Sequence, residues 1–148
     1  MLTITKLLNN FQKLDTEKLI KKSLTETIPR FETIQKEQLK FGKTNTGEKI
    51  TPKYRNRKYA AAKNERNPLP GLGTPDLLLT GEFQRLLDVQ VGTDVLDIVS
   101  KDDKGPELED KYKNIFGLGK GFKKEYITKD LRPVIKEKVT LAIGLKFS

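Results

Sequence analysis

The chain has 148 residues, of which 33% are charged and 35% are hydrophobic, and its formal net charge is +9. It contains neither histidine nor cysteine, which excludes disulfides, thiolate metal sites and catalytic triads built on imidazole. This length fits a single domain with a modest core. The positive charge favours acidic partners, namely nucleic acid, an anionic membrane or an acidic protein surface.

The first 41 residues are expected to form a helical arm. Apolar residues recur at helical spacing over 4–14, and Asp15 can cap a second, longer helix. Pro29 should kink or restart that helix because proline lacks the amide donor, and Gly42 should end it. We interpret residues 1–41 as a long amphipathic arm with one buried stripe.

Short irregular connections are expected next. Thr46 and Gly47 could form the tip of a short hairpin or a simple loop. Residues 54–65 have the composition of a short helix. Residues 67–75 are rich in proline and glycine, cannot form a regular element and predict an ordered connection.

The clearest strand signal follows this connection. Thr80 can cap a short helix, after which apolar residues alternate over 87–91 and 94–99. Gly92 and Thr93 lie between the two runs, so the pattern predicts an antiparallel hairpin.

The C-terminal third is expected to be mostly helical. Residues 107–116 predict a helix, and Gly117, Gly119 and Gly121 with Lys120, Lys123 and Lys124 predict a flexible basic loop. Pro133 can open a last helix, although the apolar pattern over 139–147 fits both a helix and a strand. We favour a helix from residue 133 onward and leave open whether a terminal strand follows it.

Together these elements predict an α+β fold. The helical arm of residues 1–41 and several short helices would pack on a small antiparallel sheet. Residues 42–148 would form the core, and the whole chain would be a single structural domain.

Two groups of basic residues are candidates for contact with nucleic acid or with an acidic partner. Cationic side chains attract phosphates regardless of sequence, and the interleaved Tyr54 and Tyr59 could stack on bases. The alternative is a solvated helix face whose tyrosines pack inward, which we favour because no nucleic-acid-binding motif accompanies the run. The first group is Lys53, Arg55, Arg57, Lys58, Lys63 and Arg66, and the second is Lys120, Lys123 and Lys124.

Two further sequence patterns resemble ligand-binding sites, one for phosphate and one for a metal cation, but each lacks the neighbouring residues that such a site requires. The glycines around Lys120 look like a phosphate-binding loop, yet no strand precedes them and no serine or threonine follows the lysine. The acidic residues of 102–110 could bind a hard cation, but they lack EF-hand spacing. We therefore predict no catalytic residue, no metal site and no cofactor.

Several short motifs follow one another in an order that resembles a known family. The motifs are Gln38-Leu39-x-x-Gly42, Gly47-x-x-Ile50-x-Pro52-x-Tyr54, Tyr59-Ala60-x-x-Lys63, Pro75-Asp76-Leu77-x-x-Thr80-Gly81-x-Phe83, Tyr112-x-x-x-Phe116-Gly117 and Arg132-Pro133. The series spans roughly residues 38–140 and resembles the small neck or tail-completion proteins of tailed phages, the virion-morphogenesis type, most closely the versions from phages of Bacteroidetes hosts.

The resemblance implies a fold and a role. Family members are α+β proteins that do no chemistry and assemble as rings between the head connector and the tail tube. It therefore implies a ring-forming virion subunit, assembled in the host cytoplasm, whose partners are its own copies, the neighbouring connector and tail proteins, and the DNA in the channel as a further candidate. The alternative is a basic DNA-binding or packaging accessory protein. No membrane partner is expected, since no apolar run approaches the roughly 20 residues of a span.

Overall fold

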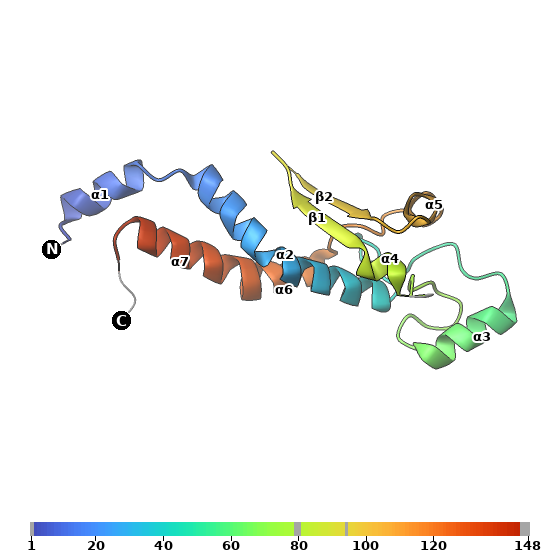
Figure 1. Ribbon diagram of the computed structural model, residues 1–148. Coiled ribbons are helices and arrows are strands. Elements are labelled where there is room, and N and C mark those ends of the chain that lie inside the picture. Colours follow the sequence, from blue (N-terminus) through green and yellow to red (C-terminus); the bar gives the residue numbers. More distant parts are fainter. Residues whose placement is uncertain (1, 79–80, 94, 146–148) are drawn as a thin grey trace.

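The computed structural model describes residues 2–78, 81–93 and 95–145 (Figure 1). It has the predicted α+β fold, with a two-stranded antiparallel sheet and helices from end to end of an elongated molecule. None of the helices in these ranges is long and apolar enough to cross a membrane. The elements are α1 (Ile4–Gln12), α2 (Thr16–Lys40), α3 (Arg57–Arg66), α4 (Glu82–Arg85), β1 (Leu87–Val91), β2 (Leu96–Ser100), α5 (Gly105–Lys111), α6 (Lys120–Tyr126), the π-helical turn η1 (Ile127–Leu131) and α7 (Arg132–Ala142).

The long helix α2 begins and ends at the predicted residues. The Asp15 side chain accepts a hydrogen bond from the Lys18 amide and caps the first turn. Pro29 lies inside the helix, which remains continuous but changes direction near its middle (Figure 1). Gly42 ends it at a φ of +68°, and the amides of Gly42 and Lys43 donate to the last carbonyls of the helix, as in a Schellman motif.

The sheet is the predicted hairpin. Leu87 lies opposite Ser100 and Val91 opposite Leu96, so β1 and β2 pair in an antiparallel register. Leu87 and Val89 point into the core. Thr80, the predicted cap of the preceding helix, lies outside the described residues, and α4 follows Gly81.

The connections in the middle of the chain are ordered. Around Thr46 and Gly47 the chain makes a tight turn that is closed by a single antiparallel bridge between Lys43 and Lys49. Of the two predicted alternatives, a hairpin tip and a simple loop, this turn is closer to the hairpin tip, with one bridge in place of two strands. The proline-rich connection is irregular, as predicted, and is bonded to the rest of the fold, because the Gly73 carbonyl accepts from the Tyr54 amide. Helix α3 begins at Arg57, later than predicted, since the Asn56 side chain caps it.

The predicted basic loop of residues 117–124 is wrong from Lys120 onward, where the chain is helical. Gly119 is the N-cap of α6, and the helix continues from Lys120 through η1 and α7. Pro133 lies in the first turn of α7, as predicted, but α7 is continuous with η1 and α6. A π turn directly before Pro133, in which the Arg132 amide donates to the Ile127 carbonyl, lets the helix continue past a residue without an amide donor.

The ends of two other predicted elements also differ. The helix expected over 107–116 stops at Lys111, and the chain beyond it is irregular because its backbone is bonded to glutamines of α2. The terminal strand does not form over residues 139–145: Val139 lies in α7, and Gly144, at a φ of +88°, follows the end of that helix. Residues 146–148 lie outside the described part of the chain.

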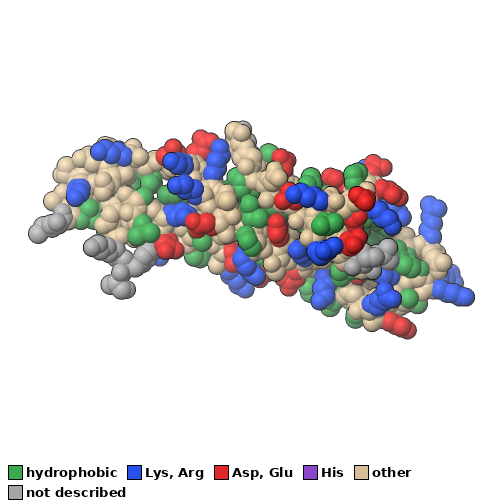
Figure 2. Space-filling model, in the orientation of Figure 1, with side chains coloured by type: hydrophobic (Ala, Val, Ile, Leu, Met, Phe, Trp, Pro, Cys, Tyr) green, Lys and Arg blue, Asp and Glu red, His purple; other side chains and the backbone are tan. Residues whose placement is uncertain are grey.

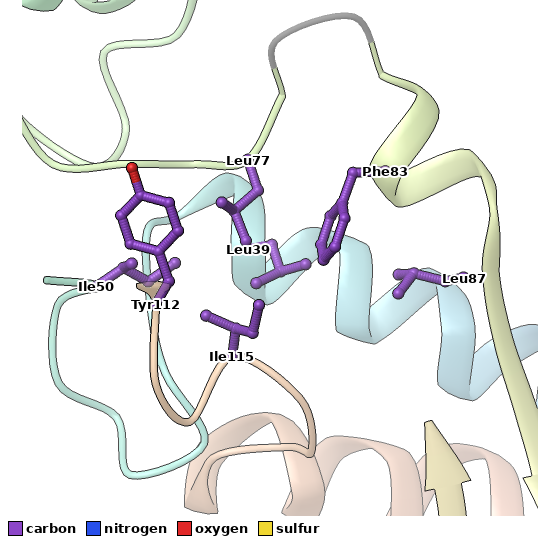
Figure 3. Packing of buried hydrophobic residues seen from close by; sticks show 7 residues of the cluster. All are labelled: Leu39, Ile50, Leu77, Phe83, Leu87, Tyr112 and Ile115. Atoms are coloured by element: carbon purple, nitrogen blue, oxygen red, sulfur yellow. The ribbon is translucent and has the colours of Figure 1, made fainter. Parts of the chain in front are cut away.

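Two hydrophobic clusters form the core, and the second half of α2 contributes to both. Leu39, fully buried, belongs to the first cluster, which Figure 3 shows assembling from several segments far apart in the sequence. Ile34 belongs to the second, where the rings of Phe31 and Tyr126 meet edge to face at 5.3 Å. The members of the first are Leu39, Ile50, Leu77, Phe83, Leu87, Tyr112 and Ile115, and those of the second are Phe31, Ile34, Val89, Leu118 and Tyr126.

Two buried glutamines of α2 hold the segment that connects α5 to α6. The Gln35 amide group donates to the Ile115 carbonyl at 3.0 Å and accepts from the Gly117 amide at 2.8 Å. Gln38 donates to the Gly117 carbonyl at 2.9 Å and accepts from the Gly119 amide at 2.7 Å. Each side chain thus satisfies one buried and one partly buried backbone group of an irregular segment, which fixes where α6 begins.

Candidate functional site

A hollow in the surface lies beside the first basic group. It is an open cleft of about 680 Å³ between the segment that leads into α3, the start of α4 and helix α5. Its apolar and aromatic lining is Tyr54, Tyr59, Leu77, Phe83, Leu108 and Tyr112, and its charged lining is Lys53, Arg55, Glu82, Asp102, Lys104 and Lys111.

The aromatic wall of the cleft is built by tyrosines. The rings of Tyr54 and Tyr59 meet edge to face, with 4.9 Å between their centroids, and Tyr112 lies beneath them in the core. Burial, with the nearby Asp76 carboxylate, raises the pKa of both Tyr54 and Tyr59. The two hydroxyls are therefore neutral at physiological pH, and they offer hydrogen bonds and apolar ring surface instead of charge.

Cations outnumber acids around the rim. Lys53 and Arg55 come from the predicted basic run, whereas Lys104 and Lys111 come from α5 and the turn before it. Lys111 also lies over the ring of Tyr112, with its ammonium 5.2 Å from the ring centroid. Such a lining suits a ligand that combines a flat or apolar group with negative charge.

Lys63 was predicted as a contact to nucleic acid or an acidic partner, and this prediction is wrong because the residue is not part of the surface. Its side chain is 9% exposed, and its ammonium lies 2.6 Å from a carboxylate oxygen of Asp76, whose side chain is 3% exposed. Asp76 also accepts from the Asn67 side chain and the Leu78 amide. The pair ties α3 to the chain before α4 and is unavailable to an outside partner.

The other predicted cations are exposed but do not converge. Arg57, Lys58 and Arg66 lie on α3 outside the cleft. Lys120, Lys123 and Lys124 are exposed on α6, and none of them lines the cleft. Sequence reasoning missed Lys104, Lys111 and Tyr112, because only the folded chain brings α5 next to residues 52–59.

The glycines around Lys120 do not form a phosphate-binding loop. The amides of Gly117 and Gly119 already donate to Gln35 and Gln38, so they cannot also bind phosphate oxygens. Among residues 2–78, 81–93 and 95–145, no group of three or more acidic side chains lies close enough to hold a metal ion. The acids of 102–110 instead make local bonds: Asp102 accepts from the Lys104 amide and Asp110 pairs with Lys113.

Fold and surface together define a small α+β protein with a two-stranded sheet, a helical arm and a basic, aromatic cleft. Comparison with protein-family models, with curated proteins and with solved structures finds no match to the chain.

Proposed function

We propose that the protein is a non-enzymatic structural subunit of a phage particle that forms a ring at the head–tail interface. One observation carries the proposal: several of the motifs that resemble the neck and tail-completion family supply residues of the core, among them Leu39, Phe83 and Tyr112. Gln38 binds the Phe116-Gly117 segment, and Phe83 stacks on Phe116 with 5.9 Å between the ring centroids. These motif residues stabilise the fold. A stable fold is what a subunit that acts through its surfaces needs.

The direct test is the composition of particles. Virions produced by the strain that encodes the chain are purified and analysed by mass spectrometry and by immunogold labelling. We expect the protein in purified virions, with label at the junction of head and tail, and we expect a deletion strain to accumulate heads and tails that do not join. Its absence from purified virions would contradict the proposal.

The exposed cations support a second candidate function, DNA binding. Arg55, Arg57 and Lys58 are exposed next to the aromatic cleft, and within the described part of the chain they form no ion pair. Such side chains attract phosphate regardless of sequence, and the tyrosines beside them could stack on unpaired bases.

Charge reversal tests this candidate. Replacing Arg55, Arg57 and Lys58 with glutamate should weaken binding of a DNA duplex at least about tenfold and lower the salt dependence of the binding constant, because phosphate contacts are lost. Fluorescence anisotropy at several salt concentrations measures both. The same reversal at Lys120, Lys123 and Lys124 tests the second basic group separately. Equal binding by wild type and the first variant would remove the role given to Arg55, Arg57 and Lys58.

A further inference from the structure

The floor of the cleft is apolar and belongs to the folded core. Leu77, Phe83 and Tyr112 are buried members of the first hydrophobic cluster, and each of them also lines the cleft. Figure 3 shows these three side chains next to one another, with Leu77 between the two rings. Tyr54 and Tyr59, whose rings meet edge to face, form the wall beside this floor. A bulky apolar group placed here would therefore be enclosed by rings and aliphatic side chains that the core already holds in position.

The lining of the cleft has an excess of positive charge. Four cations and two acids line it, which gives a net charge of +2. Both acids are engaged, since Glu82 lies 3.6 Å from Arg85 and Asp102 accepts from the Lys104 amide. The remaining acids of α5 and of the turn before it do not line the cleft. Figure 2 shows basic side chains, with acidic ones between them, projecting at the end of the molecule that carries α3 and α5 (Figure 1). Within the described part of the chain no ion pair neutralises the four cations of the lining, which are Lys53, Arg55, Lys104 and Lys111.

The apolar floor distinguishes between two anionic ligands that would suit this charge, a nucleotide and an acidic peptide segment. A nucleobase carries donors and acceptors along its edges, and these would lose their hydrogen bonds to water against Leu77, Phe83 and Leu108. An aromatic side chain such as that of phenylalanine buries only carbon and hydrogen at the same place. Carboxylates on either side of it in the peptide would lie at the rim, beside the unpaired cations. The lining therefore favours the peptide.

We propose that the cleft binds an acidic peptide segment of a partner protein. One bulky aromatic side chain of the segment lies on the apolar floor, and carboxylates on either side of it contact the cations of the rim. An aromatic anchor in a preformed pocket, surrounded by complementary charge, is the arrangement in which a few residues supply most of the binding energy of an interface. The inference goes beyond the virion role and does not depend on it, because it names the chemistry of the partner and not the particle in which the partner is found.

Peptides of defined sequence test the site in the full-length protein. The test ligand is a peptide with a central phenylalanine between two pairs of glutamates, acetylated and amidated at its ends. Its titration into isotope-labelled protein, followed by the shifts of backbone amides in nuclear magnetic resonance spectra, gives both the dissociation constant and the place of binding. We expect shifts in residues 52–59 and 104–112, and binding at least about tenfold tighter than that of the same peptide with serine in place of phenylalanine, because the floor then has no occupant. Raising the salt concentration should weaken binding of both peptides.

Two matched variants test the charge. Lys104→Glu with Lys111→Glu should weaken binding of the phenylalanine peptide at least about tenfold, because like charges then meet at the rim. Lys123→Glu with Lys136→Glu makes the same change of charge at exposed positions of α6 and α7 away from the cleft and should stay within about twofold of wild type.

Several results would overturn the proposal. They are no shift with the peptide at millimolar concentration, equal binding of the phenylalanine and serine peptides, equal binding by the two variants, and shifts outside the cleft. A strand of oligothymidine that bound in the cleft more tightly than the peptide would also overturn it and would assign the site to unpaired nucleic acid. The virion test is separate, since a subunit found in particles can lack this site, and a protein absent from them can have it.

Discussion

Replacing Asp76 with asparagine should lower the free energy of unfolding by about 3 to 5 kcal/mol, the loss typical of breaking a buried ion pair by removing one partner. Asparagine keeps the shape of the side chain and a carbonyl oxygen for the Leu78 amide. It removes the charge that faces the Lys63 ammonium at 2.6 Å. A buried cation is then left without a counter-ion, which is the source of the loss. Urea unfolding followed by circular dichroism measures it.

Three further variants separate this cause from a general disturbance. Lys63→Met should cost less than Asp76→Asn, because the remaining carboxylate still accepts from Asn67 and Leu78. The double variant should recover much of the loss, since it leaves no unpaired charge. Lys58→Met, on the exposed side of the same helix, should change stability by no more than about 0.5 kcal/mol. Equal losses in Asp76→Asn and Lys58→Met would contradict the argument.

The network around Asp76 also explains why a cleft exists beside it. The Asp76 backbone carbonyl accepts from the Gln84 side chain, and Asn67 reaches from the end of α3 to the Lys40 carbonyl at the end of α2. Helices α2, α3 and α4 are thus joined through Asp76 and Asn67. Tyr54 and Tyr59 lie next to this network, so its polar bonds hold the aromatic wall of the cleft in place.

Local signals account for the parts of the fold that the sequence predicted. Asp15 and Gly42 mark the ends of α2 because capping depends on a few neighbouring residues. The hairpin of β1 and β2 was predictable for the same reason: alternation and a short turn are contained within the segment itself.

The errors at Lys63, at the basic loop and at the cleft involve contacts between distant segments. Lys63 looked like a surface cation, and only Asp76, in another segment, shows that it is buried. The residues after Gly117 looked like a loop, but Gln38 of α2 fixes Gly119 as a helix cap. The cleft has the same origin, because Lys104 and Lys111 reach it only when α5 folds beside residues 52–59.

Replacing Gln38 with alanine should lower the free energy of unfolding by about 2 to 4 kcal/mol. The substitution leaves the buried Gly119 amide and the partly buried Gly117 carbonyl without their partner. An unsatisfied buried group costs about 1 to 3 kcal/mol, and a partly buried group costs less because water can reach it. Alanine is the better helix former, which offsets a few tenths of a kcal/mol. Denaturant unfolding gives the loss, and hydrogen exchange should show faster exchange at the Gly119 amide.

Two controls decide whether the bonds of Gln38 are the cause. Glu37→Ala, at the exposed neighbouring position of α2, should stay within about 0.5 kcal/mol of wild type. Gln38→Glu keeps the size of the side chain and an oxygen for the Gly119 amide, but it places a carboxylate oxygen against the Gly117 carbonyl and should destabilise at least as much as alanine. If Gln38→Glu were as stable as wild type, space filling rather than hydrogen bonding would hold the segment. The start of α6 would then be fixed by the packing of Leu118 and Tyr126 against Phe31 and Ile34 in the second cluster.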